Sequence, residues 1–134
     1  MYEKLVPELR DDPAGIGYAA MSDQQALDAL KAATVQRIRS SMGGHELFVN
    51  TVSAEFAALT VEKRQLWIAF CSGGTIDPGH ATVVGFVTWV FGAQSQTVAA
   101  LAAARMETIL RTSHLGISPV PHLAEIRTAR EMFQ

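Results

Sequence analysis

The residue types that could do chemistry are few in this sequence, and Cys71 with His80 is the first pair to consider. A thiol beside an imidazole can act as a nucleophile with its general base. Cys71, however, follows the apolar run Trp67-Ile68-Ala69-Phe70, and no orienting third group or oxyanion-binding motif accompanies the pair. We therefore expect Cys71 to be a packed thiol and His80 to be a polar residue at the start of a helix.

The remaining histidines do not have the spacing of a metal site. His45 adjoins Glu46, and His114 and His122 lie eight positions apart. Zinc or iron sites built on a helix place their ligands three or four residues apart, on one face. The sequence therefore predicts no metal centre.

Two further motifs are better explained as structure than as catalysis. The run Ser72-Gly73-Gly74-Thr75 is glycine-rich but lacks the lysine of a phosphate-binding loop, so we expect a turn that ends a helix. Asp11 and Asp12 are adjacent carboxylates, yet acid catalysis needs a pocket and a raised pKa. We expect them to be solvated or capping groups. No catalytic, cofactor-binding or metal-binding residue is predicted, and we do not expect an enzyme.

The two tryptophans leave one alternative open. Trp67 and Trp89 could line a small-molecule pocket between helices. Both are surrounded by apolar residues at helical spacing, which favours a place in the core for each.

Length and composition predict one compact domain. The chain has 134 residues, of which 49% are hydrophobic and 18% are charged. Its net charge of −2 gives no reason to expect nucleic acid, and the nearest basic clusters are the pairs Arg37 with Arg39 and Arg127 with Arg130.

A single cysteine excludes an intrachain disulfide and suits a reducing compartment. The first residues do not have the pattern of a signal peptide, so we expect synthesis in the cytoplasm.

The stretch from Pro78 to Ala104 contains no charged side chain and is predicted to organise the fold. Residues 81–91 are apolar on nearly every side, which in water requires neighbours all round. Asp77-Pro78 is a strong helix start and Gly92 a helix end, so a central buried helix is predicted at about 78–91. The polar run 92–97 interrupts the stretch well before the roughly 20 residues that a membrane span needs.

Start and stop signals divide the rest of the chain into short helices, with a capping box of Ser22 and Gln25 and N-terminal caps at Ser53, Thr60 and Ser95. They are expected at 2–10, 22–34, 45–50, 54–59, 61–72, 96–106 and 109–114, with a last one starting at Pro119 or Pro121. Residues 35–41 are ambiguous and are predicted as a loop, and no convincing alternation indicates a strand. We predict an all-α fold, a compact bundle of about six to eight short helices around the central helix. It forms a single domain, 1–134, in which 1–21 provide an N-terminal arm and turn that could be extended.

The turn before the second helix carries a resemblance. It reads Asp12-Pro13-Ala14-Gly15-Ile16-Gly17-Tyr18-Ala19-Ala20-Met21-Ser22-Asp23. This turn resembles a leader found in small proteins of the structural gene modules of tailed bacteriophages. The likeness continues at residues 54–60, 66–71, 76–78, 91–97 and 113–116, and the chain departs from it at Ser113-His114-Leu115-Gly116-Ile117, where those proteins favour Glu-Leu-Gly-Leu-Gly.

The resemblance implies an all-α virion structural protein, made in the host cytoplasm. Its leading form is a head–tail connector, a neck or adaptor subunit that joins copies of itself and other virion proteins (portal, capsid or tail). Alternatives are capsid decoration, tail completion, or a phage-encoded binding module outside the virion. No specific nucleic acid, membrane or cofactor is expected. Residues 1–33 carry six acids and three bases, so copies could meet head to tail with the more basic remainder and close a homo-oligomeric ring.

Overall fold

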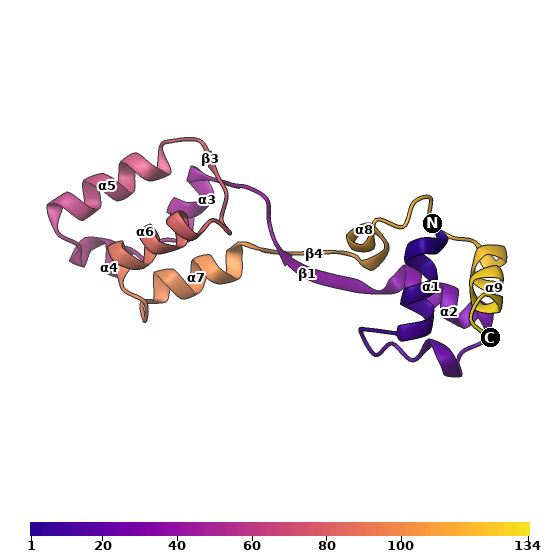
Figure 1. The fold of residues 1–134 in the computed structure, drawn as a ribbon. Coiled ribbons are helices and arrows are strands. Elements are labelled where there is room, and N and C mark those ends of the chain that lie inside the picture. The colour runs from indigo at the N-terminus through magenta and orange to yellow at the C-terminus, as the bar shows by residue number, and fades with distance from the viewer. The chain divides into compact units, whose positions relative to one another are not determined.

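The computed structural model describes residues 1–134 and is mainly helical, with nine α-helices, one 3-10 turn and four short strands. The chain divides into two compact units. Unit 1 comprises residues 1–36 and 108–134, and unit 2 comprises residues 37–107. Each unit has a buried apolar cluster of its own. Figure 1 labels the elements along the chain.

Unit 1 is built from four α-helices and the 3-10 turn. They are α1 (Tyr2–Asp11), η1 (Tyr18–Ala20), α2 (Asp23–Ala32), α8 (Arg111–Leu115) and α9 (Leu123–Glu131). Ser22 forms the predicted capping box with Gln25 at the start of α2. The Asp12 carboxylate accepts the backbone N–H groups of Ile16 and Gly17, each at 2.7 Å, and so orders the turn before η1.

The core of unit 1 gathers side chains from both ends of the sequence. Leu5, Leu30 and Ile126 are fully buried, one from each of the three longer helices. Leu5 and Leu9 lie four residues apart on α1 and therefore face the core together. Residues 2–11 are thus a packed helix, and the extended form allowed for the N-terminal arm is not adopted there.

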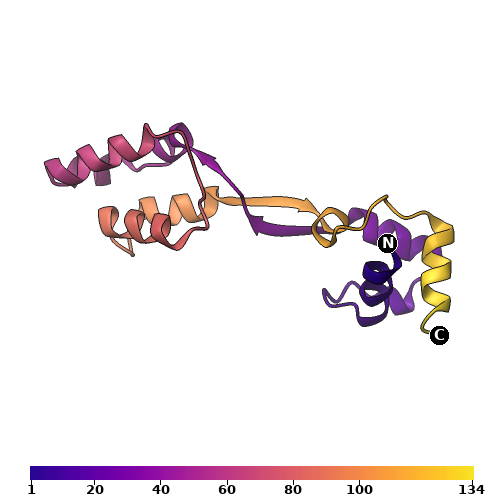
Figure 2. The ribbon, with the colours of Figure 1, turned by 45° about the horizontal axis from the view of Figure 1, so that its top comes forward.

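Unit 2 contains the other five helices. They are α3 (Gly44–Val49), α4 (Ser53–Ala58), α5 (Val61–Cys71), α6 (Ala81–Phe91) and α7 (Gln96–Ala104). Thr60 caps α5 and Ser95 caps α7, as predicted, but the cap predicted at Ser53 is wrong, because Val52 is the N-cap of α4 and no side chain caps that helix. Trp67 of α5 is fully buried among aromatic rings, and α6 and α7 lie side by side in both ribbon views (Figures 1 and 2).

Two small sheets correct the prediction of a purely all-α fold. In one, β1 (Thr34–Ile38) pairs with β4 (Met106–Leu110). In the other, β2 (Met42–Gly43) pairs antiparallel with β3 (Thr75–Ile76). Strand β1 therefore replaces residues 35–38 of the predicted loop 35–41, and β4 replaces the end of one predicted helix and the start of the next. The strands are short, most of β1 is exposed, and each partner is distant in sequence, so no local alternation indicated them.

The central helix also differs from its prediction. It begins at Ala81, not at Pro78, because His80 is its N-cap and accepts the Thr82 N–H at 3.1 Å. Asp77 instead accepts the N–H of Gly79 at 3.0 Å, within the preceding turn. Only Val87 and Val90 are buried on α6. The expectation that neighbours cover this helix all round is therefore wrong for the chain taken alone.

The division into two units does not decide whether residues 1–134 unfold as one domain, so the single-domain organisation stays a prediction. None of the helices combines the length and the apolar character that crossing a membrane requires.

Candidate functional site

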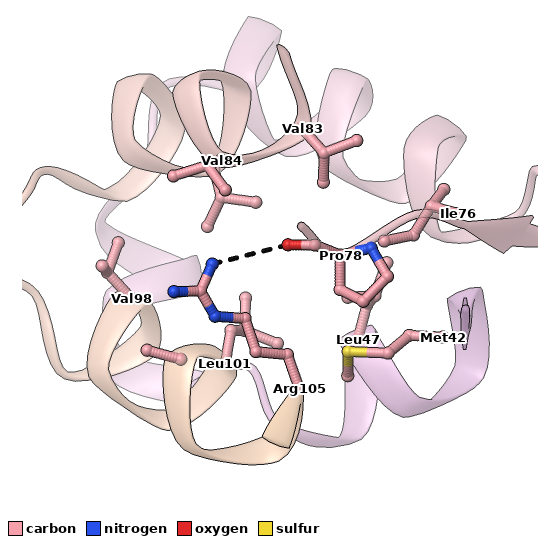
Figure 3. A pocket seen from close by; sticks show the side chains of 11 residues that line it. Met42, Leu47, Ile76, Pro78, Val83, Val84, Val98, Leu101 and Arg105 are labelled. Atoms are coloured by element: carbon pink, nitrogen blue, oxygen red, sulfur yellow. Dashed lines mark hydrogen bonds between the residues drawn. The ribbon is translucent and has the colours of Figure 1, made fainter. Parts of the chain in front are cut away.

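Unit 2 contains an apolar pocket. Its volume is about 130 Å³, and it lies between α6, α7 and the turn that leads into α6 (Figure 3). Ten of its eleven lining residues are apolar: Met42, Leu47, Ile76, Pro78, Val83, Val84, Val87, Val98, Leu101 and Ala102. The eleventh is Arg105, so one cationic group faces an otherwise apolar space.

Arg105 is placed there by the end of α7. It is the C-cap residue, one turn after Leu101, and its backbone N–H donates to the Leu101 carbonyl at 3.0 Å. The side chain reaches from the helix end toward Val84 and Pro78, as Figure 3 shows. One guanidinium N–H group makes a long hydrogen bond of 3.5 Å to the Pro78 carbonyl oxygen.

The Nε atom of Arg105 has no acceptor. It is the one buried side-chain nitrogen or oxygen of the chain without a hydrogen-bond partner. Six of the eight arginines form ion pairs with carboxylates, and Arg64 and Arg105 do not. A guanidinium is permanently charged and offers donors in a planar fork, so this arrangement suits holding an anion and does not suit acid–base chemistry.

The structure does not join Cys71 to His80, since His80 caps α6 and no hydrogen bond links the two residues. Cys71 instead shares a shallow hollow with His45 and Phe48. Burial raises the pKa of the Cys71 thiol to about 11, which keeps it protonated near neutral pH. This arrangement gives no activated nucleophile.

The other predicted groups have structural places. No three His, Cys, Asp or Glu side chains lie together in a way that could hold a metal ion. Asp11 pairs with Arg10 on the surface at 2.8 Å, and Asp12 orders its turn as described above. The glycine pair after α5 ends that helix as predicted, with Gly74 at φ 92°.

The two tryptophans differ from one another. Trp67 is a core residue, as predicted: its indole N–H donates to Thr51 Oγ1 at 3.0 Å and its ring meets Phe91 edge to face at 4.9 Å. Trp89 is 51% exposed, with the Lys63 ammonium 4.6 Å from its ring centre, so its predicted place in the core is wrong. Neither tryptophan lines the pocket.

The basic pairs considered for nucleic acid are occupied by carboxylates. Arg37 pairs with Glu107 at 2.7 Å, and Arg39 makes two hydrogen bonds to Glu46. Asp23 is held by both Arg127 and Arg130, at 3.3 and 2.9 Å. The hydrogen bond from Arg130 lowers the pKa of Asp23, and that from Arg39 lowers the pKa of Glu46.

A buried polar network in unit 1 has no sequence signature. The carboxylate of Glu8 accepts two hydrogen bonds from Arg111, at 2.6 and 2.9 Å, and one from the Tyr18 hydroxyl at 3.1 Å. Burial and the nearby Glu8 charge raise the pKa of Tyr18. The members come from α1, η1 and α8, and every strong donor has an acceptor. The network therefore holds the unit together and presents no free group to a ligand.

Exposed apolar side chains are concentrated on unit 2. Nine of the twelve large exposed apolar residues lie there: Ile38, Phe48, Val49, Val61, Leu66, Ile68, Val84, Trp89 and Met106. Val49 and Val61 are the most exposed, at 66% and 61%. Large exposed apolar surface is a common mark of a protein–protein interface.

The sequence did not indicate Arg105 as a site residue, although the uncharged stretch that ends just before it was recognised. Arg105 is the first charged residue after the uncharged stretch that follows Asp77. A lone cation that ends a long apolar stretch is a usable signal for a charge held against a core.

Comparison with protein-family models, with curated proteins and with solved structures finds no match to this chain.

Proposed function

We propose that this chain is a structural protein of a tailed bacteriophage virion and acts through protein–protein contacts as a head–tail connector subunit. The resemblance of the Asp12–Asp23 turn and its continuation along the chain supports the class. The exposed apolar surface of unit 2 is the observation that carries the assembly role.

Covering the exposed apolar side chains of unit 2 would be energetically favourable. Leaving apolar area in water forfeits roughly 25 cal/mol per Å² that burial would gain. Helix α6 has no charged residue, yet Val84 and Trp89 on it are exposed. A neighbouring chain that covered these residues would recover that free energy, which favours association over a solitary monomer.

Charge gives less support to assembly than the sequence suggested. Of the six acids in residues 1–33, Glu8, Asp11 and Asp23 pair with arginines of unit 1, and Asp12 accepts backbone N–H groups. These groups are engaged within their own chain and are not free for a neighbour. We therefore place the driving force of the proposed contact on the apolar surface of unit 2.

Symmetry separates this role from its alternatives. A connector forms a closed ring of about a dozen copies, in which each contact joins two different surfaces. A decoration protein follows the symmetry of the capsid lattice, and a tail-completion protein sits at the tail end. A binding module outside the virion is a monomer or dimer.

Native mass spectrometry of the purified protein, with denaturing mass spectrometry of the parent particle, tests the proposal. A ring-sized oligomer, or about a dozen copies per particle, is the expected result. Hundreds of copies per particle would replace the connector role with decoration. A monomer that is absent from particles would refute both virion roles.

A further inference from the structure

We infer that the Arg105 pocket receives a carboxylate group that follows a small apolar side chain on a neighbouring protein chain. This inference goes beyond the assembly role, because it specifies the chemistry of a partner segment. It holds whether the neighbour belongs to a ring, a capsid or another complex.

The guanidinium of Arg105, whose Nε atom has no acceptor, indicates that the ligand is an anion. Nearly all buried polar groups in folded proteins have hydrogen-bond partners, so a lone exception calls for an explanation. Nε of Arg105 is that exception here, and the only acceptor of its side chain is the Pro78 carbonyl at 3.5 Å. A carboxylate matches the planar fork of donors with two oxygens and neutralises the charge, which a neutral ligand would not do.

The apolar walls of the pocket indicate that the group attached to the anion is apolar. Apart from Arg105 they consist of apolar side chains, among them Val87, Val98 and Leu101. A volume of about 130 Å³ accommodates a group of a few heavy atoms. The carboxylate therefore fits best when it is attached to a short apolar chain, with the guanidinium as the single polar anchor.

The rim of the pocket indicates a protein segment and not a free acid. Val84 lines the pocket and is 39% exposed, and Ala102, which also lines it, is exposed. A small acid would leave these side chains in water. A segment with an apolar residue beside its acidic one would cover both.

The chain itself carries such a pattern at the start of α5. Val61 is 61% exposed, and Glu62 is exposed and forms no ion pair. A second copy of this chain is therefore one source of the segment, and the Val-Glu pair is a suitable probe.

The test is an NMR titration of the full-length ¹⁵N-labelled protein with acetyl-Val-Glu-N-methylamide. The matched control is acetyl-Val-Gln-N-methylamide, which has the same shape and no charge. We expect the Glu peptide to shift the Arg105 Nε–H signal saturably, with a dissociation constant of about 1 mM, and the Gln peptide to bind at least about tenfold more weakly.

Two variants assign the effect to the guanidinium. R105M should abolish binding, and R64M, which removes the other arginine without an ion pair, should leave it unchanged. R105K keeps the positive charge but lacks the planar fork of donors, so it should fold and bind about tenfold more weakly than the native chain. It replaces R105M in the test if R105M does not fold. The amide spectrum of each variant reports whether it is folded.

Three results would overturn the inference. The first is no saturable shift with the Glu peptide. The second is equal binding of the Glu and Gln peptides, which would show that the guanidinium does not select a carboxylate. The third is binding of free 4-methylpentanoate without binding of the Glu peptide, which would make the pocket a site for a small acid. None of them bears on copy number or ring formation, so the proposed assembly role is tested separately.

Discussion

The two units of this protein are similar in size but stabilise themselves differently. Unit 1 contains four of the six ion pairs, including the one between Glu8 and Arg111, whose side chains are only 2% and 12% exposed. Unit 2 contains the aromatic cluster around Trp67 and nine of the twelve large exposed apolar residues. In unit 1 the buried charges of Glu8 and Arg111 are paired with each other. Unit 2 leaves apolar side chains exposed and two arginines, Arg64 and Arg105, without an ion pair.

The difference indicates which unit meets other molecules. A buried charge that is already paired gains little from a neighbour, because a new contact would have to displace the existing one. A unit with exposed apolar side chains gains free energy when they are covered. We therefore place the interaction surfaces on unit 2 and give unit 1 a mainly structural role.

The largest expected effect comes from removing the buried carboxylate of unit 1. The substitution E8A leaves the Arg111 guanidinium and the Tyr18 hydroxyl without their acceptor. We expect it to lower the unfolding free energy of unit 1 by about 3–5 kcal/mol. Urea unfolding followed by NMR signals of Leu5 and Ile126 measures this change.

A matched control and a second probe sharpen this result. D11N removes an exposed carboxylate paired with Arg10 and should leave stability nearly unchanged, because solvent screens the pair. Trp67 and Trp89 both lie in unit 2, so tryptophan fluorescence reports on that unit alone. We expect the fluorescence transition to shift less than the unit 1 signals in E8A. Equal shifts would instead show that residues 1–134 unfold as one cooperative domain.

The next effect concerns a close approach inside unit 2. A Cβ atom on Gly44 would lie 1.7 Å from the backbone carbonyl oxygen of Cys71, where α3 crosses α5. We expect G44A to destabilise unit 2 by about 3 kcal/mol, because backbone atoms must move apart. Gly43 has open space at its Cβ position, so G43A should change stability by less than about 1 kcal/mol. Tryptophan fluorescence in urea measures the stability of both variants. Equal stabilities of G44A and G43A would contradict the close approach of Gly44 to Cys71.

A smaller effect is expected on association. Tryptophan is enriched among residues that dominate protein interfaces, and Trp89 is half exposed on unit 2. We expect W89S to weaken self-association by about 2 kcal/mol, or roughly 30-fold, in sedimentation velocity. V120S changes an exposed apolar residue of unit 1 and should have no effect. Loss of association in V120S but not in W89S would place the interface on the other unit.

The smallest effect is a dependence of stability on pH in the acid range. The hydrogen bond from Arg130 lowers the pKa of Asp23, and the Thr97 hydroxyl lowers that of Glu55. A carboxyl group with a lowered folded-state pKa stabilises the fold above its unfolded pKa of about 4, and this contribution is lost as the pH falls toward the folded value.

Variants separate the two units in this range. D23N should flatten the loss of unit 1 stability as the pH falls below about 4, and E55Q should do so for unit 2. Urea midpoints at pH 5, 4 and 3 measure these slopes. An unchanged slope in D23N would show that its ion pairs with Arg127 and Arg130 do not contribute.

The sequence by itself determined the local features of this protein. Ser22, Thr60 and Ser95 were identified as helix caps because a cap depends on residues three positions apart. The turn at Gly74 and the mainly helical class followed from equally short-range patterns. Trp67 was assigned to the core from helical spacing, and it is buried.

Tertiary structure alone decided the pairings between distant residues. Strand β1 pairs with β4, about 70 residues further along the chain. The hydrogen bonds between Glu8 and Arg111 join residues that are 103 positions apart. The exposure of α6 and the unpartnered Arg105 depend on how many neighbours the chain can supply to one helix, which no local pattern encodes. Local propensity is set by near neighbours, whereas burial is set by the whole packed unit, and the candidate site belongs to the second kind.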